Sequence, residues 1–225
     1  MAFRRGATLC GRPTDTELTR DMASIGLNFA SAMDSQADIE GTLVHASALG
    51  MDDDDLRVLS VLTTWLGVHQ AYINADRLVR CVREHPSSRV HAYWAAVSHW
   101  LRNDRRFARL ADSFDGNAVD LLPVGTEFQL ARRGEDPRFS GSALRLPAGT
   151  LRDRVVDVVS PERLVRRHAG YRNRVLIGPT WRADVWTVLE ADPDLSVAEA
   201  ARRAGSSFAS AWTAARDFRL CRDVA

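Results

Sequence analysis

The sequence contains no lysine, and all 30 of its basic residues are arginine. Because 29 aspartate and glutamate residues balance them, the formal net charge is only +1, which excludes a uniformly basic nucleic-acid-binding protein. Long apolar runs are also missing: none approaches the roughly 20 residues that cross a bilayer, and no apolar secretory core follows the amino terminus. We therefore predict a cytoplasmic protein that does not contact a membrane.

Cysteine is scarce, and its spacing excludes the common uses of this residue. Cys10, Cys81 and Cys221 are odd in number and far apart, so we predict three ordinary thiols rather than a disulfide framework or a zinc site. The six histidines show no zinc-binding spacing either. Four consecutive aspartates, Asp52 to Asp55, predict the start of a helix, because acidic residues there cap the free amides and complement the helix dipole. Neighbouring side chains within one turn point in different directions, which argues against a metal site at these aspartates. We predict no metal ion and no cofactor.

Motifs that support catalysis are absent as well. The sequence has no glycine loop of the P-loop type and no Gly-x-Ser-x-Gly nucleophile turn. Asp153 and Asp157 lie four residues apart on a predicted helix, whereas a nucleotidyltransferase metal pair needs carboxylates on alternate residues of one strand. We therefore predict no catalytic residues and a protein that is not an enzyme.

What the sequence does contain is helical periodicity over residues 1–112. Apolar residues recur at intervals of three and four, first at Leu18, Met22, Ile25 and Phe29. Further helices are predicted from residue 39 to Gly50, and after Asp55, Asn74 and Ser87 or Ser88. Trp65, Trp94 and Trp100 fall on apolar faces and are predicted core residues. This pattern predicts an amino-terminal helical bundle, which we expect to serve dimerisation or partner binding.

Two segments with a different residue pattern follow the bundle. Residues 113–150 form a β-containing connector in our prediction, either a small hairpin or a three-stranded sheet, which acts as a linker or packs onto the helical bundle. The candidate strands are 119–124, 126–131 and 143–146, with a turn at 134–137. Residues 151–180 are predicted as an arginine-rich helical segment, with one helix over 151–159 and another that begins at Ser160. From Arg145 to Arg182 there are nine arginines and only three acidic residues. Such a block supplies either phosphate contacts or a solvated face with internal ion pairs.

The last segment, residues 181–225, has the pattern of two helices joined by a tight turn. Ser196 and Glu199 have the spacing of a capping box. Small residues follow at 200, 201 and 204, and Gly205 is placed where the first helix must end in a left-handed conformation. A second helix then has an apolar face of Phe208, Ala211, Trp212, Ala215 and Phe218, and a third lies upstream over residues 183–189.

Over residues 181–220 this pattern resembles the helix-turn-helix DNA-binding domains of bacterial regulators, with Ala201, Gly205 and Ala211 at the positions that the family keeps small or tight. Too few residues follow Leu220 for the two-stranded wing of winged members. In outline the whole chain is similar to antitoxin-type repressors and phage-defence regulators of the AbiEi sort, and to the helical accessory proteins of BREX defence systems. The implied fold class is mainly α, with the bundle, the β-containing segment and the terminal helix-turn-helix in that order.

The resemblance implies a site for double-stranded DNA on the last two helices. The residues that would contact base edges are Ser207, Ser210, Thr213 and Arg216. Those that would contact phosphates are Arg163, Arg166, Arg167, Arg172, Arg174, Arg182, Arg202 and Arg203. The expected function is that of a homodimeric, sequence-specific transcriptional regulator of an antitoxin or phage-defence type. The alternative interpretation is a protein–protein interaction module, an antitoxin or assembly factor, that does not read DNA directly.

Overall fold

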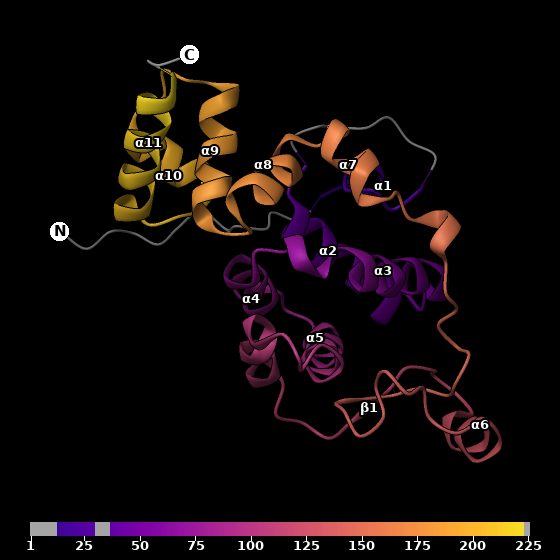
Figure 1. The fold of residues 1–225 in the computed structure, drawn as a ribbon. Coiled ribbons are helices and arrows are strands. Elements are labelled where there is room, and N and C mark those ends of the chain that lie inside the picture. The colour runs from indigo at the N-terminus through magenta and orange to yellow at the C-terminus, as the bar shows by residue number, and fades with distance from the viewer. Residues whose placement is uncertain (1–12, 30–36, 223–225) are drawn as a thin grey trace.

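The computed structural model describes residues 13–29 and 37–222, and it is mainly helical, which confirms the predicted fold class (Figure 1). Its α-helices are α1 (Asp15–Ser24), α2 (Ile39–Met51), α3 (Leu56–His69), α4 (Ala75–Glu84), α5 (Ser88–Trp100), α6 (Thr126–Arg133), α7 (Pro161–Arg167), α8 (Ala169–Ile177), α9 (Trp181–Ala191), α10 (Val197–Ala204) and α11 (Phe208–Arg222). Short 3-10 helices lie at η1 (Gln70–Tyr72), η2 (Arg105–Ser113) and η3 (Val155–Asp157). None of the helices in this part of the chain combines the length and apolar character that a membrane crossing requires.

The helices of the bundle begin at the predicted capping residues. The Asp55 side chain accepts hydrogen bonds from the backbone amides of Arg57 and Val58, and Asn74 and Ser87 cap α4 and α5 in the same way. The predicted stop at Gly50 is slightly early, because α2 continues to Met51. Gly50 is required for packing instead, since a Cβ there would lie 2.7 Å from Cβ of Leu59 on α3.

The region between the bundle and the carboxyl-terminal helices differs most from the prediction. The only strands in the described ranges, β1 (Val119–Asp120) and β2 (Leu144–Arg145), form a two-stranded parallel sheet, so both predicted alternatives, the hairpin and the three-stranded sheet, are wrong. The predicted strand over 126–131 is also wrong, because these residues form α6, which follows Gly125 at φ +78° and has Glu127 in its first turn. The predicted helix over 151–159 is reduced to η3, because the following residues pair with residues 26–28: the Val159 amide donates to the Gly26 carbonyl at 2.8 Å.

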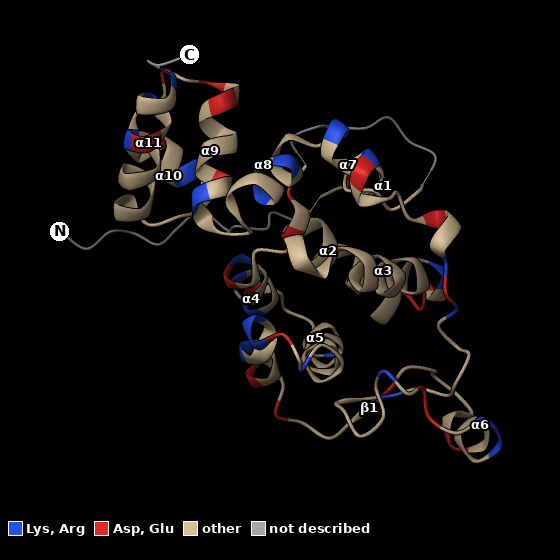
Figure 2. Ribbon diagram, in the orientation of Figure 1, with Lys and Arg blue, Asp and Glu red and all other residues tan. Residues whose placement is uncertain are grey.

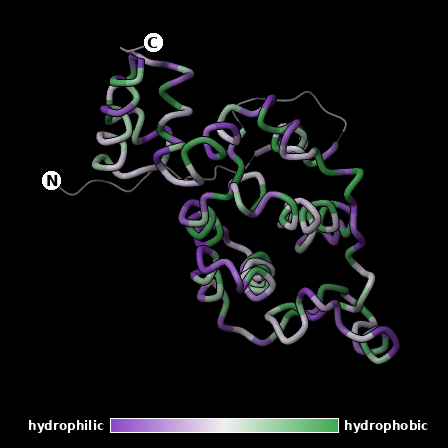
Figure 3. Tube along the Cα trace, in the orientation of Figure 1, coloured by the Kyte–Doolittle hydropathy of each residue, from purple (hydrophilic) through white to green (hydrophobic). Residues whose placement is uncertain are grey.

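The described residues form two separate hydrophobic cores. Figure 3 shows hydrophobic segments both in the helices of the main body and in the carboxyl-terminal helices. The larger core runs from α1 to Tyr171 on α8 and includes Leu121, Phe139 and Leu146, so residues 113–150 pack onto the helical body, which is one of the two predicted alternatives. Trp65 and Trp94 are fully buried in this core, as predicted. Trp100 is half-buried and packs against it. The smaller core lies within α9, α10 and α11, which we call the carboxyl-terminal unit.

The cysteines differ in their surroundings. Cys81 is buried and disulfide-bonded, so the predicted thiol is wrong at that position. Cys221 is an exposed free thiol, in agreement with the prediction. Cys10 lies outside the described residues.

Candidate nucleic-acid interface

The turn between α10 and α11 has the geometry that the sequence pattern predicts. The Ser196 hydroxyl accepts a hydrogen bond from the Glu199 amide at 3.2 Å, and Gly205 ends α10 at φ +67°. The reciprocal half of the capping box is not formed, because the Glu199 carboxylate binds the guanidinium groups of Arg202 and Arg203 instead. These side-chain hydrogen bonds lower the pKa of Glu199 to about 2, so its charge persists at any physiological pH.

Only part of the predicted apolar face of α11 is buried. Ala211, Ala215 and Phe218 pack on α9 and α10 together with Ala214, whereas Phe208 and Trp212 are each 51% exposed. The apolar stripe is therefore wider than the contact that two short helices make with α11. Phe208 and Trp212 lie on the predicted apolar face but outside the core of the unit.

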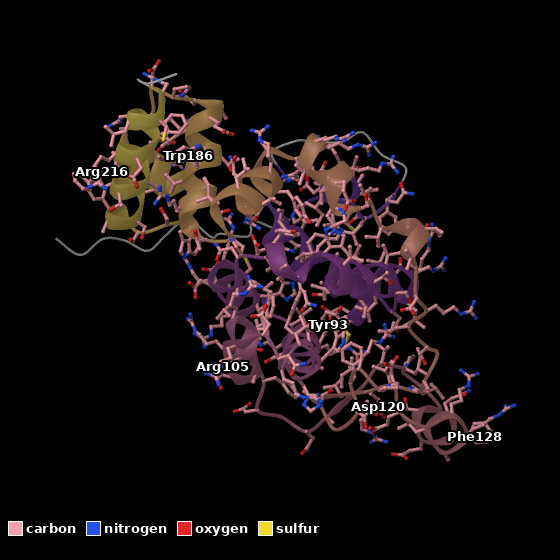
Figure 4. All side chains as sticks on the ribbon, in the orientation of Figure 1. Tyr93, Arg105, Asp120, Phe128, Trp186 and Arg216 are labelled. Carbon is pink, nitrogen blue, oxygen red and sulfur yellow. The ribbon has the colours of Figure 1, made fainter. Side chains whose placement is uncertain are left out.

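All four predicted base-contacting residues are exposed, Ser207 just before α11 and the other three on it, but the hydroxyls of Ser207 and Thr213 already donate within the protein. Ser207 accepts from the Ser210 amide at 3.1 Å and donates to the Ser210 hydroxyl at 2.9 Å, so it caps the helix. Thr213 donates to the Ala209 carbonyl at 3.2 Å. Ser210 and Arg216 therefore remain the residues with outward donors, and Figure 4 shows Arg216 projecting from the outer side of α11.

The Arg216 guanidinium is positioned by two neighbours. It lies 5.7 Å from the centre of the Trp212 ring, a cation–π distance, and it donates to Asp217 at 2.9 and 3.1 Å. Asp217 also pairs with Arg182 at 3.1 Å. These exposed ion pairs contribute about 0–1 kcal/mol each and are readily exchanged for another anion. Arg182 and Arg216 are thus held in place without being buried.

The carboxyl-terminal unit carries little charge of its own. Residues 181–222 contain six arginines and six carboxylates. Arg202 and Arg203 are exposed, but both pair with Glu199, and Arg203 also lies 3.7 Å from Asp192. At the end of α11, Arg219 and Arg222 are exposed and form no ion pair with any described side chain, so they are cations of the unit that remain unpaired.

Arg174 does not lie at the surface, and its predicted phosphate contact is wrong. Its side chain is 4% exposed and is held between Glu40 of α2 and Asp184 of α9 at 2.6 and 2.8 Å. A guanidinium enclosed by two carboxylates is already neutralised and has no path to a polyanion. Arg172, two residues earlier, is exposed and pairs with Glu190 at 2.8 Å.

The other predicted phosphate contacts, Arg163, Arg166 and Arg167, are exposed on α7 but do not lie beside α11. α7 contacts α8, α8 contacts α9, and α9 contacts α11, so two helices separate α7 from α11 (Figure 2). The structure therefore divides the arginines that the sequence places together, and a phosphate contact by the α7 group stays a prediction.

In place of α7, the structure brings helix α4 of the bundle to the helix-turn-helix. Arg77 donates from Nη1 to the Ala204 carbonyl and Arg80 donates from Nη1 to the Gly205 carbonyl, both at 2.7 Å. The same two guanidinium groups lie 5.9 and 5.5 Å from the centre of the Trp181 ring. Sequence reasoning missed this contact because the arginines of an amphipathic helix look like an ordinary solvated face.

The outer surface of the carboxyl-terminal unit also has an apolar component. Trp212 and Leu220, which is 61% exposed, line a shallow depression between α11 and the first turn of α10, together with Val197, Arg216 and Arg219. Over residues 13–29 and 37–222, no three histidine, cysteine, aspartate or glutamate side chains lie together in a way that would hold a metal ion.

No protein-family model, no curated protein and no solved structure matches this chain.

Proposed function

We propose that this protein binds double-stranded DNA in a sequence-specific manner through α11, as a transcriptional regulator. The observation that carries the proposal is the exposed side of α11 in a three-helix unit with its own core and a left-handed glycine turn. An α-helix of this kind fits the major groove, where the donor and acceptor pattern of each base pair is distinct. The antitoxin or phage-defence type of regulator is proposed on the architectural resemblance alone.

Arg216 and Ser210 would read base edges. The DNA backbone would be held by the predicted arginines that are exposed, namely Arg163, Arg166, Arg167, Arg172, Arg182, Arg202 and Arg203. The Trp212 ring supports the Arg216 guanidinium, which reduces the side-chain entropy lost when that group binds guanine O6 and N7. The Ser207 and Thr213 hydroxyls already donate within the helix, so they would act only as acceptors from DNA. Few base contacts per protomer favour a homodimer on paired half-sites, with the amino-terminal bundle as the dimerisation or partner surface.

A salt titration tests the proposal directly. Binding of the full chain to a random-sequence duplex should weaken linearly in the logarithm of the salt concentration, because each phosphate contact releases counterions. A duplex containing the preferred sequence should bind more tightly at every salt concentration. Absence of binding to any duplex at low salt would overturn the proposal.

The second candidate function is a protein interaction through the same unit, and the exposed apolar side chains of α11 favour it. Phe208, Trp212 and Leu220 are all at least half exposed, which is unusual for a helix that reads DNA alone and typical of the centre of a protein interface. Replacement of Leu220, which has no part in the proposed DNA contacts, by alanine should then abolish capture of a partner from the protein's own cells. Retention of duplex binding in that variant would separate the two functions.

A further inference from the structure

We infer that helix α4 of the amino-terminal bundle forms part of the DNA-binding surface, with Arg80 and Arg83 contacting phosphates beside the amino-terminal end of α11. The inference rests on the proposed function and extends the site from the carboxyl-terminal unit onto the main body. The partner remains duplex DNA, and the new element is the pair of α4 arginines.

The position of Arg80 gives the first argument. Its guanidinium donates to the Gly205 carbonyl at 2.7 Å, which places it at the turn that immediately precedes Ser207 and α11. The side chain is nevertheless exposed. A phosphate that approaches the amino-terminal end of α11 would therefore meet the helix amides and the Arg80 guanidinium together.

The chemistry of the contacts gives the second argument. Arg77, on the buried side of α4, is neutralised by Asp38 at 3.0 Å and by Glu40 at 3.6 Å. Arg80 instead donates to a backbone carbonyl and lies over the Trp181 ring, and it forms no ion pair with a carboxylate in the described part of the chain. These neutral partners orient the cation and leave it available to an anion.

Arg83 lies one turn further along α4, about 4.5 Å along the helix axis from Arg80. It is exposed, and it makes no ion pair or hydrogen bond with any residue that the structure describes. Residues three apart on a helix lie side by side. Arg80 and Arg83 therefore form a row of two cations that begins at the turn between α10 and α11.

Buried contacts fix α4 against the carboxyl-terminal unit, so this row keeps its place relative to α11. The Asn74 side chain, which caps α4, donates to Asp184 of α9 at 2.8 Å. Arg77 bonds the Ala204 carbonyl in the same junction. Because the carboxyl-terminal unit has as many carboxylates as arginines, the two α4 cations are a large addition to the charge available near α11.

The test is a salt titration of wild-type protein, R83Q and R80Q/R83Q on a random-sequence duplex of about three helical turns. R83Q is the decisive variant, because Arg83 forms no hydrogen bond or ion pair with a described residue whose loss would disturb the fold. R132Q/R133Q is the matched control: it also removes two exposed arginines, from α6, at the end of the molecule opposite the carboxyl-terminal unit (Figure 1). Circular dichroism checks that all variants are folded.

Between about 50 and about 200 mM salt, the ratio of wild-type to R83Q affinity should fall about threefold, and the ratio to R80Q/R83Q about tenfold, while R132Q/R133Q parallels the wild type. If wild-type protein binds the duplex and R83Q shows the same salt slope, the inference is overturned and the proposed function stands. An equal loss of slope in R132Q/R133Q also overturns it. If wild-type protein binds no duplex, the inference and the proposed function are overturned together.

Discussion

The Arg174 guanidinium forms a two-pronged ion pair with the Glu40 carboxylate, at 2.6 and 2.8 Å, across 134 positions of sequence. Both side chains are buried, and Asp184 accepts from the same guanidinium at 2.8 and 3.0 Å. Burial by itself lowers the pKa of Arg174, but the two carboxylates raise it well above its ordinary value, so the group stays charged. Through the Arg174 cation, which is on α8, this cluster joins α2 of the main body to α9 of the carboxyl-terminal unit.

Removing that cation should therefore be costly. We expect Arg174→Gln to lower the free energy of unfolding by about 3–5 kcal/mol, because it leaves Glu40 and Asp184 buried without a counter-charge. Urea denaturation measures the change. Arg172→Gln is the control: its exposed pair with Glu190 should contribute only about 0–1 kcal/mol. Equal losses in the free energy of unfolding would show that the buried cluster contributes no more to stability than the exposed pair.

Stability should also depend on the protonation of His69. Burial lowers its pKa to about 4 in the folded protein, although a hydrogen bond with the Val159 carbonyl and the charge of Glu162 act in the opposite direction. The unfolded chain binds this proton near pH 6.5, so acid favours unfolding: stability is complete above about pH 6.5 and is lost progressively as the pH falls to about 4. The loss should reach about 3 kcal/mol at most.

Urea unfolding at several pH values checks this expectation. In His69→Gln the side chain no longer titrates, so its unfolding free energy should change less between pH 6.5 and pH 4 than that of the wild type. Parallel pH profiles for the two proteins would assign the acid sensitivity to other groups.

Gly205→Ala should destabilise the carboxyl-terminal unit. The backbone of Gly205 is left-handed at φ +67°, a conformation that costs a residue with a Cβ about 1–2 kcal/mol. Because the core of the unit packs on α10 and α11, the thermal unfolding transition followed by circular dichroism should shift to a lower temperature. Gly67→Ala, inside α3, is a useful comparison because its backbone is helical and the nearest atom to an added Cβ is 3.7 Å away. A fall in the melting temperature for Gly67→Ala and none for Gly205→Ala would contradict the expectation.

Arg216→Ala should relax sequence preference. A well-placed bidentate contact to guanine discriminates against the wrong base by about 1–3 kcal/mol, and the substitution should remove that difference at one position of the site. Competition binding with single-base variants of a selected duplex measures it. Arg219→Ala, one turn along the same helix, should instead weaken binding to all sequences alike. A uniform loss for Arg216→Ala would assign that residue to the phosphates.

The sequence predicted the local parts of this fold well. Caps at Asp55, Asn74 and Ser87 and the turn at Gly205 depend on hydrogen bonds and φ angles within a few residues, which the residue types specify. Segments without strong local preference were predicted poorly. Residues 126–131 alternate like a strand yet form α6, because a pattern this short does not distinguish a strand from a helix.

The site shows the same division. That Ser210 and Arg216 lie on an exposed face of α11 follows from helical periodicity in the sequence. The surroundings of Arg174, Arg163 and Arg80 do not follow from the periodicity, because each depends on which distant segment packs beside that residue. Arg174 is buried in an ion pair with Glu40, and Arg163 is separated from α11 by α8 and α9. Arg80 lies at the turn between α10 and α11 because α4 packs there.

The sequence by itself determined where most helices begin, the mainly helical class and the turn between α10 and α11, because these are set by interactions between residues close in the chain. Only the tertiary structure decided which arginines face solvent and which lie beside α11. Charge in the sequence is counted residue by residue, but the charge available to a partner depends on burial and on carboxylates that arrive from more than 100 positions away.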